Sequence, residues 1–313
     1  MTNGKSATIE AMVNQGEIEK AAQIIRAGGL VVFPTETVYG LGANALDAVA
    51  VRKIYALKGR PSTSPLIVHV AGIEQAHELA AEWPEEAEKL AREYWPGPLT
   101  LVVPKKPIIP DEVTAGLATV GLRMPRHPIA LELLCAARVP IAAPSANRFT
   151  QLSPTTALHV REAFGSETPF LLDGGPCEVG LESTVIAVTK DGLEVLRPGM
   201  AFIEDAMSPV ESSETADRSP GQHKKHYSPR TRVLLVNQGQ LPQRGRGAYL
   251  WIEREAAASR AVRMPEEPEA YAAQLYSRLH EMDGEGLDWI AVEYPPETRK
   301  WAAIRDRLTR AAY

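Results

Sequence analysis

The apolar and polar positions of the chain follow two periods in turn. Segments with apolar residues at helical spacing alternate with short, continuous apolar runs of strand length. The spacing predicts helices over 17–27, 48–57, 73–82, 85–94, 129–137, 155–164, 271–282 and 302–311. The apolar runs predict strands over 30–33, 65–70, 99–103, 120–124, 140–143, 169–172, 184–188, 194–196, 233–236, 247–252 and 289–292. Strands and helices interleaved in this way indicate an α/β protein with a mixed sheet.

This pattern stops between residues 204 and 230. The segment is rich in Ser, Pro, Glu and Asp and has no apolar period, which is typical of a linker. We therefore expect a first α/β domain over 17–203, a linker over 204–230 and a small second α/β domain over 231–313. A domain of about eighty residues is large enough to fold alone.

The densest candidate chemistry follows the expected strand over 30–33. Residues 34–42 read PTETVYGLG, which puts hydroxyls and one carboxylate directly after the strand. Open α/β sheets bind ligands at the carboxyl ends of their strands, and glycines let the backbone approach a ligand. A helix-capping turn is the simpler interpretation. A cap needs only one hydroxyl and leaves Glu36 and Tyr39 unexplained, so we favour a site.

Cations appear near two further strands. Lys58 and Arg60 follow an expected helix, and their point charge and planar fork suit phosphate oxygens. A basic helix end that complements the helix dipole is the simpler alternative. Arg123 lies inside an apolar strand, where an unpaired charge would cost several kcal/mol. An internal Glu or a substrate carboxylate would satisfy it.

Small polar loops recur at later strand ends. The segment 143–147, APSAN, carries a hydroxyl and an amide, and 153–155 predicts a helix cap whose backbone donors favour an anion. The segments 173–175, 180–184 and 196–199 are each more often turns than sites. Together these segments repeat one chemistry at the ends of several strands.

Composition narrows the class of protein. The chain has 313 residues, of which 44% are apolar, so it can bury a full core. Its formal charge of −5 and pI near 5.9 argue against a protein whose main role is to coat nucleic acid. Cys135 and Cys177 are too few for a disulfide framework or a zinc cluster. No signal-peptide core and no apolar run of about eighteen residues occurs, so we expect a soluble, cytoplasmic protein without membrane contact.

Several catalytic motifs are absent from the sequence. There is no P-loop, no G-x-S-x-G elbow and no H-E-x-x-H. The glycines at 40 and 42 stand seven residues after the strand, which argues against a nicotinamide or flavin cofactor. A site built from the hydroxyls and cations of these loops would work by holding anionic reactants and by neutralising charge that develops at phosphorus.

The polar blocks, in their order along the chain, resemble the threonylcarbamoyl-AMP synthase family in its long form. The blocks that carry the resemblance are PTETVYGLG, KGRPSTSPLIVHV, WPGPLTLV, VGLRMPRHP, APSAN, GLESTVI and LRPG. In the linker, HKKHYSP resembles the His-Tyr-x-Pro signature of that form, and 231–313 is a looser match. The resemblance implies a YrdC-like domain with a twisted mixed sheet and flanking helices, followed by a small Rossmann-like α/β domain.

The resemblance also implies a reaction. A nucleotidyltransferase of this family condenses L-threonine, bicarbonate or carbon dioxide, and ATP to threonylcarbamoyl-AMP and pyrophosphate, with Mg²⁺. The product passes to the tRNA threonylcarbamoyl-transfer machinery, which leaves room for a weak RNA contact. The attacking carbamate is already an anion, so the step needs electrostatic help more than a strong base.

Site residues follow by position from the same resemblance, which names no metal ligand. The implied catalytic residues are Lys58, Arg60, Ser145 and Asn147. Those implied for L-threonine are Thr35, His69, Arg123, Ala143 and Ser183, with Arg123 on the carboxylate. Those implied for ATP are Lys58, Ser62, Thr119, Ser145, Ser153, Arg197 and Tyr227. His69 would otherwise be a strand histidine satisfied by backbone, and we favour the pocket because of its place in LIVHV.

Two alternatives remain at this point. The first is a non-catalytic protein that binds double-stranded RNA or tRNA. Its basic concave face would consist of Lys58, Arg60, Arg123, Arg126 and Arg148. The acidic net charge of the chain argues against this alternative. The second is a carbamoyl-transferring maturation domain, which we expect to carry acylphosphatase or zinc-finger modules that this sequence lacks. We further expect the linker to act as a lid, so that removing 220–313 impairs formation or retention of the adenylate.

Overall fold

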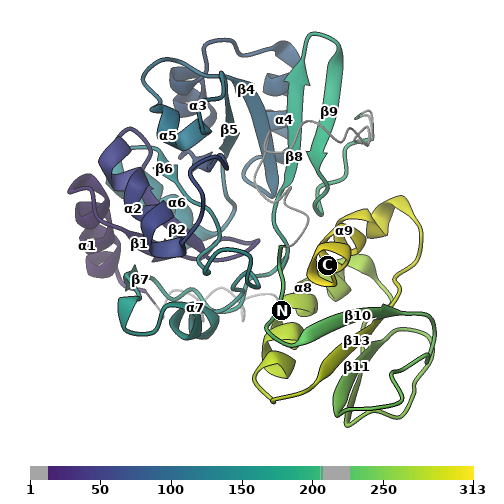
Figure 1. Ribbon diagram of the computed structural model, residues 1–313. Coiled ribbons are helices and arrows are strands. Elements are labelled where there is room, and N and C mark those ends of the chain that lie inside the picture. The colour runs from purple at the N-terminus through teal and green to yellow at the C-terminus, as the bar shows by residue number, and fades with distance from the viewer. Residues whose placement is uncertain (1–12, 205, 207–225) are drawn as a thin grey trace, which may run out of the picture.

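A computed structural model of the chain describes residues 13–204, 206 and 226–313 (Figure 1). These residues form two sheets. The first has nine strands in the order β7-β1-β2-β6-β3-β5-β4-β8-β9, and the second has four in the order β10-β13-β11-β12. The first sheet mixes parallel and antiparallel pairs, whereas every pair in the second is parallel. The expected α/β class, with a mixed sheet followed by a smaller Rossmann-like domain, is confirmed.

The strands of the first sheet are β1 (Val31–Phe33), β2 (Gly40–Asn44), β3 (Ile67–His69), β4 (Leu99–Pro104), β5 (Thr119–Arg123), β6 (Ile141–Ala142), β7 (Phe170–Leu171), β8 (Thr184–Thr189) and β9 (Gly192–Arg197). Those of the second are β10 (Arg232–Val236), β11 (Gly247–Trp251), β12 (Arg260–Arg263) and β13 (Trp289–Glu293). The helices are α1 (Gln15–Arg26), α2 (Ala48–Lys58), α3 (Ile73–Leu79), α4 (Glu85–Tyr94), α5 (Asp111–Thr114), α6 (Pro128–Ala137), α7 (Ala157–Phe164), α8 (Pro268–Asp283) and α9 (Ala302–Ala311).

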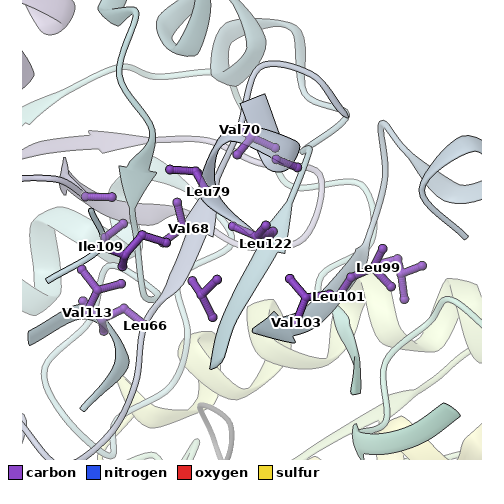
Figure 2. Close-up of a cluster of buried hydrophobic side chains, with 14 of the residues drawn as sticks. Leu66, Val68, Val70, Leu79, Leu99, Leu101, Val103, Ile109, Val113 and Leu122 are labelled. Atoms are coloured by element: carbon purple, nitrogen blue, oxygen red, sulfur yellow. The ribbon is translucent and has the colours of Figure 1, made fainter. Parts of the chain in front are cut away.

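The first sheet is covered on both faces near β1. Val31 and Phe33 pack with the apolar sides of α1 and α6, whereas Val32 belongs to the core formed with α2, α3 and α4. Successive side chains of a strand point to opposite faces, so one short strand serves both cores. Figure 2 shows part of this second core, in which Leu122 of β5 lies between Val68 of β3 and Leu101 of β4.

Residues at the two ends of helix α2 fix where the helix begins and ends. Asp47 caps its first turn by accepting from the backbone N–H groups of Val49 and Ala50. Gly59 ends the helix with a φ of 65°, a left-handed conformation that glycine adopts without strain. The turn leaves Lys58 in the last helical turn and Arg60 just beyond it, both buried.

The second domain packs its helices toward the first. Figure 1 places α8 and α9 between the four-stranded sheet and the first domain. One apolar cluster contains Leu275 and Leu308 from these helices together with Val38, Leu152 and Leu181 from the first domain. The apolar core of the second domain therefore extends across the boundary to loop residues of the first.

Three elements were not expected from the sequence pattern. Strand β2 contains the glycines that we had assigned to a loop, and it pairs antiparallel with both β1 and β6. A Cβ on Gly42 would lie 2.8 Å from atoms of Phe33 and Ile141, so glycine here permits close strand packing. The other two, α5 and β12, are four residues each and too short for a period to be recognised.

Part of the expected linker, residues 205 and 207–225, lies outside the described residues. The boundaries at 203 and 230 accordingly stay predictions. None of the helices in the described ranges combines the length and apolar character that crossing a membrane requires.

Candidate active site

One cavity collects side chains from loops that are far apart in sequence. Its lining residues are Thr35, Thr37, Val38, Gly40, Arg60, Ile67, His69, Arg123, Ala143, Pro144, Ser145, Glu182, Ser183, Arg197, His226 and Tyr227. The set includes every residue expected at L-threonine, because Thr35, His69, Arg123, Ala143 and Ser183 all line it. It also includes Arg60, Ser145, Arg197 and Tyr227 from the other expected groups.

The loop after β1 is shaped by its own hydroxyls. Thr35 Oγ1 accepts hydrogen bonds from the backbone N–H groups of Thr37 and Val38, each at 3.2 Å, and donates to the carbonyl of Val38 at 2.7 Å. These bonds form a tight turn into β2, so the loop does not cap a helix. Tyr39 instead donates to the carbonyl of Gly175 at 2.8 Å and anchors the loop outside the cavity.

Glu36 is the partner of Arg123. An Nη2 of Arg123 donates to Glu36 at 2.7 Å, and the two side chains are 5% and 2% exposed. The second carboxylate oxygen of Glu36 accepts from the backbone N–H of Arg126 at 3.0 Å. Burial alone would raise the pKa of Glu36, but the Arg123 guanidinium lowers it below its ordinary value. Glu36 therefore stays ionised and holds the fork of Arg123 at the cavity wall.

His69 lies at the end of β3 with its ring against the edge of Phe33, 5.9 Å between centroids. Burial, and secondarily the charge of Arg123, lower its pKa to about 3. His69 Nδ1 is buried and has no hydrogen-bond partner in the structure. A neutral imidazole with an unsatisfied nitrogen at a cavity wall is suited to hydrogen-bond a polar ligand.

Arg197 and Ser183 form the opposite wall. Arg197 donates from Nε and Nη2 to the carbonyl of Ser183, at 3.2 and 2.9 Å, and from Nη2 to its hydroxyl at 3.1 Å. Ser183 Oγ also lies 2.8 Å from the hydroxyl of Thr100. This arrangement fixes the position of a buried cation at the end of β9.

Lys58 and Asn147 lie behind the cavity instead of lining it. Lys58 Nζ donates to the carbonyls of Ser145, at 2.6 Å, and Asn147. The amide of Asn147 donates to the carbonyls of Arg148 and Gln151 at 2.9 and 2.8 Å. Burial, followed by the charge of Arg60, holds the pKa of Lys58 well below its ordinary value. Both residues shape the loop that presents Ser145.

Besides Lys58, three residues expected at ATP lie outside this cavity. Ser62 is exposed in the turn after α2. Thr119 lines a small neighbouring cavity, which shares Ile67 with the first. The Ser153 hydroxyl donates to Glu182 at 2.5 Å. Only some of the residues expected at ATP therefore line the same cavity in this conformation.

Sequence reasoning did not assign a role to Glu182, which lines the cavity and is 6% exposed. Its position in the GLEST block, a carboxylate among buried residues, was the available signal. His226 also lines the cavity without having been assigned a role. Beside it, Tyr227 is 1% exposed, has a φ of 58° that is rare outside glycine, and keeps a buried hydroxyl without a hydrogen-bond partner.

The residues proposed for a basic RNA-binding face do not form one. Lys58, Arg60 and Arg123 are buried, while Arg126 and Arg148 pair with Glu178 and Glu167. Within the described ranges, no group of three or more His, Cys, Asp or Glu residues is placed to hold a metal ion.

Sequence and structure comparisons show which known proteins this chain is similar to. Residues 23–199 match the family model of the Sua5, YciO and YrdC proteins, described as telomere recombination, and residues 188–313 match the C-terminal domain of threonylcarbamoyl-AMP synthase. The chain is 39% identical over 328 positions to the threonylcarbamoyl-AMP synthase of Pyrococcus abyssi, with 97% of this chain and 96% of the relative covered.

A second relative and a solved structure are equally similar. The threonylcarbamoyl-AMP synthase of Bacillus subtilis is 41% identical over 331 positions, which cover 97% of this chain and 95% of the relative. The crystal structure of P. abyssi Sua5 complexed with L-threonine superposes with a TM-score of 0.88 at 40% identity, covering 96% of this chain and 95% of that one.

Proposed function

The chain belongs to the threonylcarbamoyl-AMP synthase family in its two-domain form, and from this premise we propose that it joins L-threonine, bicarbonate or carbon dioxide, and ATP into threonylcarbamoyl-AMP. The neutral threonine amine attacks carbon dioxide and releases a proton to solvent, which gives a carbamate. A carbamate oxygen then attacks the α-phosphorus of ATP and pyrophosphate leaves. The observation that carries the proposal is the convergence of Arg60, Arg123 and Arg197 with several hydroxyls on one cavity.

The threonine end of the cavity is assigned to Thr35, His69, Arg123, Ala143 and Ser183. Arg123 uses one Nη for Glu36, and an arginine fork has further donors for a substrate carboxylate. The neutral ring of His69 would offer hydrogen bonding without adding charge. The P. abyssi structure with L-threonine supports an amino-acid site in this fold.

The ATP end is assigned to Lys58, Ser62, Thr119, Ser145, Ser153, Arg197 and Tyr227, with Arg60 and Asn147 beside Lys58 and Ser145. Arg197 and Arg60 would neutralise charge developing on the α-phosphate and the leaving pyrophosphate. Because the carbamate is already an anion, no protein base is required at the attacking atom.

The cavity must open for this set to act together. The cavity volume is about 50 Å³, which is too little for ATP beside threonine. Tyr227 and His226 close one side of it. We infer that the described end of the linker moves aside when ATP enters, as a lid would.

Magnesium would enter as a complex with ATP. Glu36 and Glu182 line or flank the cavity, but each is paired with an arginine, and no metal cluster exists among the described residues. Mg²⁺ keeps several waters and is commonly held by phosphates with few protein ligands. The ion would add positive charge at the phosphates, and no step here depends on a protein ligand to it.

The product is a mixed anhydride of a carbamate and a phosphate, so a cytoplasmic acceptor enzyme must take it up before water hydrolyses it. We assign this role to the tRNA threonylcarbamoyl-transfer machinery. A weak contact of this chain with RNA would accompany the transfer.

Pyrophosphate release from ATP tests the proposal. It should require threonine and bicarbonate together, and omission of either should reduce the rate to background. Arg123→Met should lose the pyrophosphate release that threonine stimulates. Release that continues without threonine, or tight salt-sensitive RNA binding in place of turnover, would overturn the assignment.

A further inference from the structure

A buried arginine of the second domain contacts two blocks of the first domain and the end of the linker. Arg307, on α9, donates from Nε to Glu182 at 2.7 Å and from Nη2 to the carbonyl of Pro198 at 3.0 Å. Its guanidinium carbon lies 5.0 Å from the ring centroid of Tyr227, a cation–π geometry. The side chain is 0% exposed, although it does not line the cavity.

Glu182 is the cavity residue on which these contacts centre. Its carboxylate also accepts from the hydroxyl of Tyr276, at 3.2 Å, and from that of Ser153. Tyr276 and Arg307 come from α8 and α9, so the second domain supplies a hydroxyl and the arginine that pairs directly with Glu182. These contacts account for a carboxylate that stays buried in a wall otherwise charged by arginines.

The sign of that charge matters for an anionic ligand. Among the residues that line the cavity, the carboxylate is that of Glu182. Unless Glu182 is neutralised, its charge would repel a polyphosphate beside it. Burial raises the pKa of Glu182, but Arg307 first and Arg197 second lower it, so the group remains ionised. Both arginines therefore act on the same carboxylate.

We propose that Arg307 is a positioning residue through which the second domain prepares the ATP end of the cavity. It neutralises Glu182, leaves Arg197 on Ser183 at the end of β9, and supports the ring of Tyr227. Without Arg307, Glu182 would turn to Arg197 and withdraw that cation from phosphate. The inference rests on the proposed function for the identity of the nucleotide.

Binding measurements on the full-length chain separate this role from simple stabilisation. Calorimetry with ATP alone and with L-threonine alone would be applied to Arg307→Met, Arg307→Lys, Glu182→Gln and the double variant Glu182→Gln/Arg307→Met. Arg305→Met is the matched control, since Arg305 lies on the same helix, is 37% exposed and pairs only with exposed Glu297.

Arg307→Met should weaken ATP binding about tenfold or more and change threonine binding less than about threefold. The double variant should recover ATP binding to within about threefold of the unmodified chain, because the unpaired carboxylate is gone. ATP binding by Arg307→Lys should fall between that of these two variants, since one ammonium replaces a fork that serves three acceptors, Glu182, the carbonyl of Pro198 and Asp306. Arg305→Met should bind both ligands normally.

Equal loss of ATP and threonine binding in Arg307→Met, with no rescue in the double variant, would overturn the proposal and leave Arg307 a purely structural residue. A chain that shows this binding pattern but releases no pyrophosphate would overturn the proposed function and leave the role of Arg307 intact. Should Arg307→Met be too unstable to measure, the double variant and Arg307→Lys decide the question. Weak ATP binding in the double variant would contradict the proposal.

Discussion

His159 of α7 stacks on His280 of α8 across the boundary between the two domains, with 3.9 Å between ring centroids and 15° between ring planes. His280 also donates from Nε2 to the carbonyl of Ser153 at 3.1 Å. Burial lowers the pKa of both rings, and the neighbouring His280 lowers that of His159 further, to about 3. Two neutral rings therefore join the domains, and a proton on either would face the other.

This stack predicts that stability falls on acidification. An unfolded histidine titrates near pH 6.5, so below that pH the unfolded chain binds protons that the folded chain does not. Stability should be complete above about pH 6.5 and decrease as the pH falls toward 3, by at most about 1.4 kcal/mol per pH unit for each histidine. Urea unfolding between pH 7.5 and 5 measures the slope.

His159→Phe keeps an aromatic ring and removes one titrating group, so its slope over the same range should be shallower. An unchanged slope in His159→Phe would exclude the stack as the source and assign the pH dependence to other buried histidines such as His69.

The pair formed by Glu36 and Arg123 allows stability and binding to be separated. Removing one partner leaves the other charge buried and unpaired, so Glu36→Gln and Arg123→Met should each destabilise the fold by about 3–5 kcal/mol. The double variant should regain most of that stability, because no buried charge remains. It should still fail to bind L-threonine, and calorimetry beside urea unfolding checks both. Threonine binding by the double variant would exclude Arg123 from the carboxylate site.

Lys58 holds two carbonyls of the loop that presents Ser145. Lys58→Met should leave these buried acceptors unsatisfied, lower the free energy of unfolding by about 1–3 kcal/mol and reduce kcat/KM for ATP by about tenfold or more. Lys53→Met is the control on the same helix, since Lys53 is exposed and donates to one carbonyl, that of Gly28. Similar losses in both variants would show that Lys58 has no special role.

Gly199 is required for close packing beside Ser183. A Cβ at this position would lie 2.2 Å from the backbone nitrogen of Thr184 and 2.6 Å from the carbonyl carbon of Ser183. Gly199→Ala should therefore displace the cavity wall, lower the stability by more than about 2 kcal/mol and abolish pyrophosphate release. Gly284→Ala, at the end of α8, meets nothing closer than 3.6 Å and should be tolerated. Thermal unfolding of both proteins tests the contrast, and an active Gly199→Ala would contradict it.

Most helices and strands could be predicted from the sequence because their apolar periods are long. The amphipathic spacing of α1 and α4 and the continuous apolar run of β4 are examples. Strand β2 was missed because its glycines usually mark a loop. Its pairing depends on how closely Phe33 and Ile141 approach, which is a property of the packed sheet.

The site shows the same division. A charge inside an apolar strand already required a partner for Arg123, but the sequence left open whether Glu36 or a substrate supplied it. The role of Arg307 had no local signal at all. Its partners Glu182 and Pro198 are more than a hundred residues away, and a single arginine in a helix is most often a solvated surface residue.

The sequence by itself determined the α/β class, the blocks at the strand ends and the kinds of groups that they carry, because these depend on local periodicity and residue chemistry. Only the tertiary structure decided which of those groups face one cavity, which charges neutralise each other and that the second domain supports one wall from behind. Coulomb energy and burial depend on distances between atoms. For residues far apart in the chain, folding alone sets those distances.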